Sequence, residues 1–210
     1  MRKYVNPDII VKRTVCQNIR TLWLDWKYGK KVLDDEKASP YYSQGCFHTQ
    51  SIEYSELDWI FSHLDYFDGT IMDIGCGRGR LFNYLLHKGY QGHMYGVEID
   101  PEICQFTQNR LSAYRNVTIV CADAVFSPKK EIDTYFMFCP FDRIHTNTFI
   151  NAVEQIHKSC KVIYYHSKYS DEFLHRSGWT GKIETYYSSP RKANISCCFL
   201  QYENQEIDDS

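Results

Sequence analysis

The chain alternates between short runs of apolar residues and longer stretches in which apolar residues recur every three or four positions. The short runs predict strands at residues 70–73, 92–98, 116–124, 134–138 and 161–165. The spaced stretches predict helices at residues 6–29, 55–63, 81–86, 101–114, 147–157 and 170–177. Two further strands, 182–187 and 195–202, are expected to close the sheet. Alternating strands and helices indicate an α/β fold with a mostly parallel sheet.

The N-terminal part has its own pattern. Asn6 and Pro7 predict a helix start, and Gly29 predicts its end. Apolar residues between them follow helical spacing, at Val11, Val15, Ile19, Leu22 and Trp26. We expect this stripe to dock on the main domain, or else to contact a partner. Residues 30–50 are polar and rich in turn formers, which predicts a long loop such as a lid.

Candidate chemistry begins at the end of the first predicted strand of the sheet. Asp73 is followed by glycines at positions 75, 77 and 79 and then by a helical pattern. Such a strand, glycine turn and helix lets a ligand approach the backbone closely. The spacing differs from the dehydrogenase fingerprint G-x-G-x-x-G, because Arg80 occupies its last glycine position. Glu98 ends the next strand, 19 residues after Gly79, about where such folds place a ribose-binding carboxylate.

The run D-x-G-x-G-x-G resembles the first motif of class I S-adenosylmethionine-dependent methyltransferases. Over residues 66–202 this resemblance implies a Rossmann-like fold, a mostly parallel seven-stranded sheet with helices on both faces and an antiparallel closing strand. It implies S-adenosylmethionine as cofactor, with Glu98 at the ribose hydroxyls and Asp123 at the adenine amine. Asp100 is better explained as a helix cap. The cofactor contacts expected in this region are Asp73, Gly75, Cys76, Gly77, Gly79, Glu98, Ile99, Asp123, Ala124 and Cys139.

The fourth predicted strand ends in Cys139-Pro140-Phe141-Asp142. This position resembles the fourth motif of the superfamily, which in amino-methylating enzymes reads N/D-P-P-Y/F. Cys139 replaces the side chain that holds the target nitrogen there, so methylation of an adenine or glutamine amine is not favoured. Asp142 and His166 follow strand ends and are candidates for a general base. A structural hydrogen bond in a loop explains His166 equally well.

A narrower resemblance covers the approach to the first strand of the sheet. Asp25-Trp26-Lys27-Tyr28-Gly29 and Thr49-Gln50-Ser51-Ile52-Glu53-Tyr54 are similar to segments of small bacterial methyltransferase-like proteins. The resemblance implies that Gln50 and Tyr54 contact the cofactor, although helix packing explains them equally well. Aromatic residues that could line an acceptor pocket, or lie in the core, are Tyr41, Tyr42, Phe47 and Phe141.

The composition narrows the kinds of site, partner and location that we expect. The nine cysteines include no C-x-x-C pair, so reduced thiols are expected rather than a disulfide framework or a metal site. A net charge of −2 makes a nucleic-acid partner unexpected, although residues 1–31 carry a net charge of +6. No apolar run suits a membrane span or a secretory signal, so we expect a cytoplasmic protein without a membrane partner. The oligomeric state and the methyl acceptor are left open.

We therefore expect three parts: an N-terminal helical extension and lid-like loop (1–65), a methyltransferase domain that binds S-adenosylmethionine (66–202) and an acidic tail (203–210). The expected activity is methyl transfer to a small molecule or a protein side chain, a lysine included. One alternative is a degenerate member that binds the cofactor or a partner without catalysis, because Cys139 departs from the fourth motif. A nucleotide-dependent oxidoreductase is disfavoured by the glycine spacing.

Overall fold

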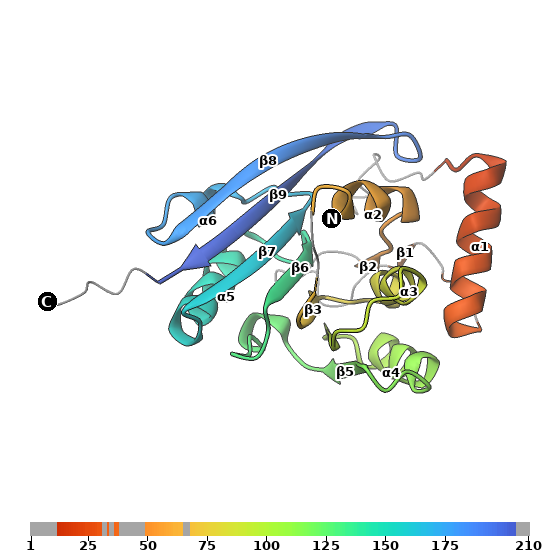
Figure 1. The fold of residues 1–210 in the computed structure, drawn as a ribbon, viewed down its shortest axis with the longest axis horizontal. Coiled ribbons are helices and arrows are strands. Elements are labelled where there is room, and N and C mark those ends of the chain that lie inside the picture. The colour runs from red at the N-terminus through yellow and green to blue at the C-terminus, as the bar shows by residue number, and fades with distance from the viewer. Residues whose placement is uncertain (1–11, 31–32, 34–35, 38–48, 65–67, 205–210) are drawn as a thin grey trace, which may run out of the picture.

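The main sheet has seven strands in the order β5-β4-β3-β6-β7-β9-β8 (Figure 1). The computed structural model describes residues 12–30, 33, 36–37, 49–64 and 68–204. Strands β3 to β7 are parallel, and β9 runs antiparallel to both of its neighbours. The strand bounds are β3 Ile71–Ile74, β4 Met94–Glu98, β5 Val117–Cys121, β6 Thr134–Phe138, β7 Ser159–Tyr165, β8 Trp179–Ser188 and β9 Ala193–Glu203. The expected mostly parallel, seven-stranded sheet is thus confirmed.

Two apolar clusters lie on opposite faces of this sheet. One joins the strands to α2 (Tyr54–Phe61), α3 (Arg80–His87) and α4 (Pro101–Leu111), and the other joins them to α5 (Arg143–Ile156), α6 (Asp171–Leu174) and the short 3₁₀ helix η3 (Ala124–Phe126). The four residues of β3 are all buried, as expected for a strand covered on both faces. Among the described helices, none is both long and apolar enough to cross a bilayer.

Two very short strands, β1 (Glu36–Lys37) and β2 (Thr49–Gln50), pair antiparallel in the segment that we predicted to be one continuous loop. That prediction is wrong at these four residues, because two residues on each side are too few to give a recognisable alternation. Tyr41, Tyr42 and Phe47 lie outside the described residues.

Helix starts follow the caps rather than the first apolar residue. The first helix, α1 (Val15–Gly29), begins after Thr14, which forms a reciprocal capping box with Gln17. Residues 12–14 are therefore not helical, and the predicted start at Asn6 lies outside the described residues. Helix α5 begins four residues before the predicted position, because the Asp142 side chain accepts a hydrogen bond from the His145 N–H.

Helix α1 docks on α3 and α4 through the opposite face from the one predicted. Its buried residues are Thr21, Leu24, Asp25 and Gly29. Ion pairs support this orientation: Asp25 pairs with Arg80 of α3, and Arg20 pairs with Asp58 of α2. A buried carboxylate needs such a partner, so the apolar stripe is left facing solvent.

A disulfide joins Cys104 of α4 to Cys121 of β5. The expectation that all cysteines are reduced is therefore wrong for this pair. The two residues are 17 positions apart, but α4 packs back against β5, which brings their Cα atoms to 5.6 Å. No spacing rule reveals a bridge that depends on this packing.

Candidate cofactor site

The carboxyl end of β3 turns sharply into α3 through the three glycines of the predicted motif. Gly75, Gly77 and Gly79 have φ angles of 75°, 52° and 77°, a region that favours glycine. The N–H groups of Gly75 and Cys76 both donate to the Val97 carbonyl of β4, at 3.0 and 2.9 Å. This turn, residues 75–79, is called the glycine loop below, and it is fastened to the neighbouring strand.

Glu98 joins the end of β4 to the glycine loop. Its Oε2 atom accepts from the Gly77 N–H and its Oε1 atom from the Asp100 N–H, both at 2.9 Å. Burial raises the pKa of Glu98, while these two hydrogen bonds oppose the rise. Asp100 caps α4 by accepting from the Glu102 and Ile103 N–H groups, the role predicted for it. Glu98 therefore lies beside the glycine loop, at the carboxyl end of β4.

Asp73 adds a second buried carboxyl group at this edge. Burial and the nearby charge of Glu98 raise the pKa of Asp73 to about 8. Two acids placed together in this way resist simultaneous ionisation. A cation bound near them would stabilise the ionised pair.

Two side chains of α4 also support the glycine loop, and neither was predicted from the sequence. Arg110 donates to the carbonyls of Arg78 and Gly79, at 2.6 and 3.2 Å, and to the side chain of Asn83. Thr107 donates to the Gly77 carbonyl at 2.8 Å. Burial lowers the pKa of Arg110 to about 10. An arginine and a threonine within a helical pattern carry no sequence signal for such a role.

Asp123, which was predicted to contact the adenine amine, and Ala124, a predicted cofactor contact, follow β5. The Ala122 N–H donates to the Glu98 carbonyl at 3.1 Å, which brings Asp123 and Ala124 to the same edge as the end of β4 and Ile99. Asp123 is half-buried, and its carboxylate accepts from the Val125 N–H to cap η3. Capping uses one Asp123 oxygen, and the other keeps its capacity to accept.

Two residues with unusual backbone conformations end β6 and β7. Cys139 has a φ of 40° and His166 a φ of 57°, a strained region for side chains other than glycine that is frequent at functional sites. The Cys139 sulfur lies 3.9 Å from the Tyr164 hydroxyl, and burial raises the pKa of the Cys139 thiol. Pro140 lies beside Gly75, so the end of β6 reaches the glycine loop.

The two candidate bases differ in protonation. Burial alone would raise the pKa of Asp142, but its hydrogen bonds from the backbone and ring of His145 lower it below the ordinary value. Loss of water around the ring lowers the pKa of His166, and the nearby cations Arg191 and Lys168 lower it further. The lowered pKa favours the neutral form of His166, which can accept a proton, whereas the lowered pKa of Asp142 makes it a weaker base, and its carboxylate already caps α5.

Gln50 and Tyr54 lie in different surroundings. The buried Gln50 Nε2 atom has no hydrogen-bond partner within the described part of the chain, which is costly unless a ligand supplies one. The Tyr54 hydroxyl donates to Asp25 at 2.7 Å and accepts from Asn83 at 3.2 Å. Its polar end therefore faces α1 and α3.

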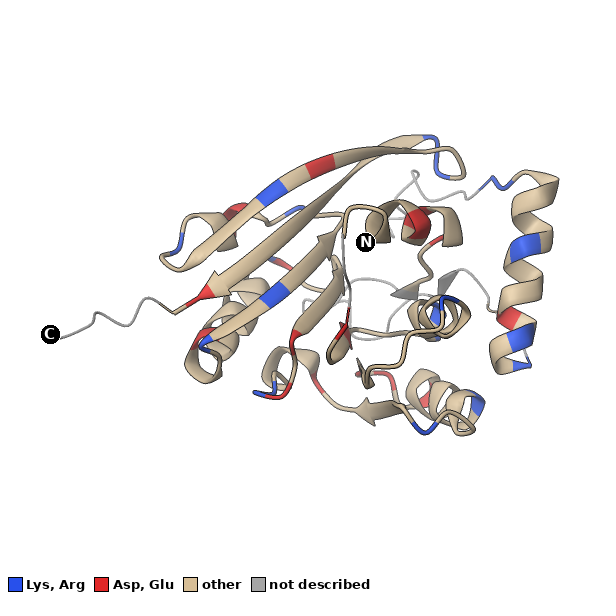
Figure 2. Ribbon diagram, in the orientation of Figure 1, with Lys and Arg blue, Asp and Glu red and all other residues tan. Residues whose placement is uncertain are grey.

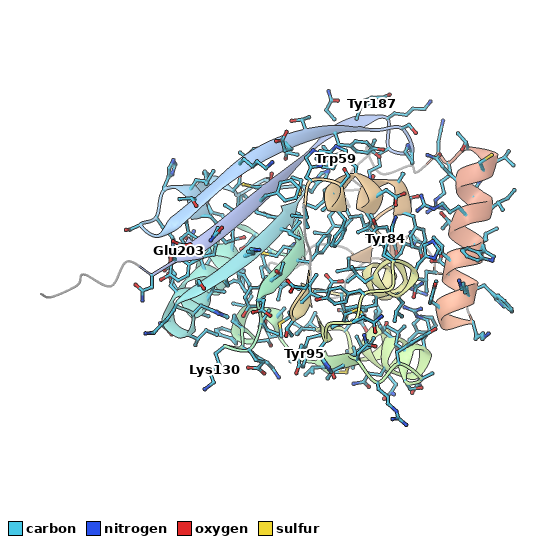
Figure 3. The ribbon with its side chains drawn as sticks, viewed as in Figure 1. Trp59, Tyr84, Tyr95, Lys130, Tyr187 and Glu203 are labelled. Atoms are coloured by element: carbon cyan, nitrogen blue, oxygen red, sulfur yellow. A yellow bond between two sulfur atoms is a disulfide. The ribbon has the colours of Figure 1, made fainter. Side chains whose placement is uncertain are left out.

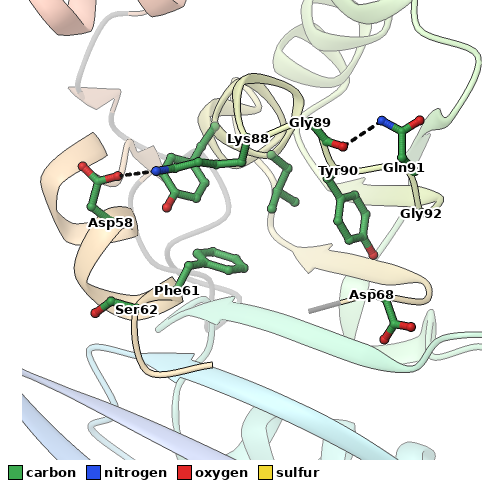
Figure 4. Close-up of a pocket in the computed structure, with 11 residues that line it drawn as sticks. Asp58, Phe61, Ser62, Asp68, Lys88, Gly89, Tyr90, Gln91 and Gly92 are labelled. Atoms are coloured by element: carbon green, nitrogen blue, oxygen red, sulfur yellow. Dashed lines mark hydrogen bonds and ion pairs between the residues drawn. The ribbon is translucent and has the colours of Figure 1, made fainter. Parts of the chain in front are cut away.

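A cavity of about 530 Å³ lies at the opposite edge of the sheet (Figure 4). Its lining includes Asp68 and Gly92, which precede β3 and β4, and the ion pair between Asp58 and Lys88 spans 3.2 Å at one side. In open parallel sheets ligands bind at the carboxyl ends of the strands. This cavity is therefore separate from the glycine loop and its acids.

Comparison with known proteins agrees with this geometry. Residues 71–162 match the family model described as a methyltransferase domain. The central part of the sheet, β3 to β7, is thus similar in sequence to a methyltransferase domain. A tRNA (guanine-N(7)-)-methyltransferase of Eremothecium gossypii is 26% identical to the chain over 156 residues, which cover 56% of this chain and 55% of that protein. The chain spans 55% and 32% of the lengths of the two curated relatives it matches.

Solved structures share the methyltransferase fold at low identity. An RNA methyltransferase of Salinibacter ruber in complex with S-adenosylhomocysteine has a TM-score of 0.54 and 13% identity, over 76% of this chain and 97% of that one. The magnesium protoporphyrin IX methyltransferase of Synechocystis, with bound S-adenosylmethionine, has a TM-score of 0.51 and 17% identity, over 71% and 77%. At such identities the likeness shows the fold.

Proposed function

We propose that this chain transfers a methyl group from S-adenosylmethionine to an acceptor. The observation that carries the proposal is the contact between Glu98 and the glycine loop at the carboxyl edge of the sheet. Methyltransferases of similar fold that have S-adenosylmethionine or S-adenosylhomocysteine bound support the choice of cofactor. We also propose the division into an N-terminal extension (1–65), a catalytic domain (66–202) and a tail (203–210).

The residues at this edge fit such a cofactor. Carboxylate oxygens of Glu98 and Asp123 suit ribose hydroxyls and the adenine amine, and the Gln50 Nε2 atom needs an acceptor. Further contacts are proposed from the glycine loop, Asp73, Ile99, Ala124 and Cys139, with Tyr54 contributing through its ring. When bound, the cofactor supplies a methyl group activated by a sulfonium.

The chain's own contribution is then alignment and proton removal. The glycine loop and Glu98 hold one reactant, so that the acceptor is attacked in line and away from water. Where the acceptor must lose a proton, neutral His166 takes it, with Asp142 as the weaker candidate. Known relatives act on RNA and on small molecules, and both classes are candidates for the acceptor here.

A second candidate function is cofactor binding without catalysis. Cys139 favours it, because its neutral thiol replaces the amide or carboxylate that holds the acceptor in amino-methylating enzymes. Incubation with methyl-labelled cofactor and fractionated cell extract separates the two. We expect label in one acceptor fraction and loss of transfer in His166→Ala. Cofactor binding with no labelled acceptor would favour the non-catalytic reading.

A further inference from the structure

The solvent-facing side of α1 is apolar. Its large side chains are exposed by 74% at Val15, 62% at Ile19, 48% at Leu22, 49% at Trp23 and 57% at Trp26. A surface helix normally turns such a stripe toward the core. Figure 3 shows side chains of α1 projecting away from the rest of the molecule. An exposed patch of this kind marks an interaction site.

The same face also carries positively charged side chains. The Lys27 ammonium lies 4.6 Å from the Trp23 ring centre, and the Lys30 ammonium lies 4.7 Å from that of Trp26. Asp25 is the one acid of α1, and it is buried against Arg80. The exposed side of α1 therefore carries aromatic rings and ammonium groups without a carboxylate of its own.

Arginines around α1 face inward while lysines face solvent. Arg13 forms two hydrogen bonds with Glu53, and Arg191 forms two with Glu56; both acids are buried. Lys12 is exposed in the segment that leads into α1. Glu53 and Glu56 are thus neutralised internally, and the exposed Lys12, Lys27 and Lys30 add positive charge to the surface.

The cationic surface continues from α1 to the turn between β8 and β9. The Lys12 N–H donates to the Pro190 carbonyl at 2.6 Å, and Lys192 of that turn is exposed. Figure 2 shows Lys and Arg at the turn, before α1 and along α1. Arg191 lies over the Phe138 ring, whose centre is 5.9 Å from that of His166. The surface therefore extends toward His166, the candidate general base at the end of β7.

We propose that this surface, formed by the outer face of α1 and the β8–β9 turn, binds a single-stranded nucleic acid that presents the methyl acceptor. The proposal rests on the proposed methyl transfer and names its substrate class. Bases stack on exposed aromatic rings while lysines contact phosphates, and the aliphatic residues extend the apolar surface. The net charge of −2 made a nucleic-acid partner unexpected, because that sum also counts acids that are paired inside the molecule.

Other occupants fit less well. A second copy would bring Lys27 and Lys30 against another α1 that exposes no carboxylate, and like charges would repel. An anionic membrane would satisfy the lysines and tryptophans. It would not explain why the cationic surface runs on to the turn beside Phe138 and His166, which a substrate must reach.

The test measures fluorescence anisotropy of labelled 20-nucleotide RNA and DNA strands of one mixed sequence. We expect the wild-type protein to bind saturably. The double variant Trp23→Ala/Trp26→Ala should bind about tenfold more weakly. The double variant Lys27→Glu/Lys30→Glu should lose at least as much affinity. The salt dependence of binding should fall by roughly 0.7 per lysine removed. The control Lys130→Glu/Lys182→Glu makes the same charge change on exposed lysines elsewhere and should keep wild-type affinity.

Calorimetry with S-adenosylhomocysteine on the same variants separates this proposal from the proposed function. The α1 variants should keep wild-type cofactor affinity, because their side chains point away from the glycine loop. No anisotropy change up to about 100 µM protein, the weak end of non-specific binding, would overturn the proposal. Equal losses of nucleic-acid affinity in the control and the α1 variants would also overturn it. The same holds if the protein binds phosphatidylserine vesicles but no nucleic acid, or if sedimentation shows that it dimerises through α1.

Discussion

The Oε2 atom of Glu98 lies 2.9 Å from the backbone nitrogen of Gly77. One carboxylate at the end of β4 therefore shapes the glycine loop that follows β3, and in our proposal it also receives the ribose hydroxyls. The two strands are neighbours in the sheet, paired from Ile71 with Met94 to Ile74 with Val97. Their shared register places the acid beside the loop.

Replacing Glu98 with alanine should weaken binding of S-adenosylhomocysteine by roughly 1–3 kcal/mol, the cost of leaving buried polar partners unsatisfied. Calorimetric titration measures this loss. Glu131→Ala is a suitable control, because Glu131 is exposed near the amino end of β6, at the opposite edge of the sheet. Equal affinity in the two variants would remove Glu98 from the site.

The preference for S-adenosylmethionine over S-adenosylhomocysteine should rise with pH up to about 8. Without ligand, Asp73 is mostly protonated below its pKa of about 8, and it ionises above it. The ionised form attracts the sulfonium, which only the methyl donor carries, while the amino acid groups common to both ligands cancel in the ratio of affinities. The ratio is measured by titrations from pH 6.5 to 9. A ratio that does not change with pH, or that falls, would contradict this role.

Two glycines with similar backbone angles should respond differently to substitution by alanine. Gly79 and Gly89 have φ angles of 77° and 75°, so each variant should lose about 1–2 kcal/mol of stability from the backbone. A Cβ at Gly89 meets nothing within 4 Å, whereas one at Gly79 would lie 2.8 Å from the Arg110 guanidinium.

Gly79→Ala should therefore lose more stability in urea unfolding and also weaken cofactor binding, because it displaces the arginine that supports the glycine loop. Gly89→Ala should keep wild-type affinity. If both variants bind equally well, the support that Arg110 gives to the loop has no role in binding.

The Cys104–Cys121 disulfide should stabilise the fold. The bridge closes a loop of 17 residues, for which lost chain entropy in the unfolded state predicts about 3 kcal/mol. Urea unfolding with and without a reductant measures the difference, and Cys104→Ser/Cys121→Ser should match the reduced protein. Cys16→Ser, at an exposed free cysteine, should change nothing. Equal midpoints for oxidised and reduced protein would contradict the bridge.

Local patterns allowed the parallel strands and the cap at Asp100 to be predicted, because they depend on residues near in sequence. The glycine motif and the acid at 98 also follow from spacing, since the fold places successive strand ends at one edge. Longer-range effects escaped prediction. The apolar stripe of α1 favoured the wrong docking face, because the pairing of Asp25 with Arg80 involves residues 55 positions apart. Arg110 and the disulfide depend likewise on how α4 packs.

Calorimetric titration of S-adenosylmethionine into the purified chain tests the central claim most directly. The account predicts saturable binding of one molecule per chain, weakened by roughly 1–3 kcal/mol when Glu98 is replaced with alanine. Absence of binding heat at several temperatures, in protein that unfolds cooperatively, would contradict a cofactor site at the ends of β3, β4 and β5.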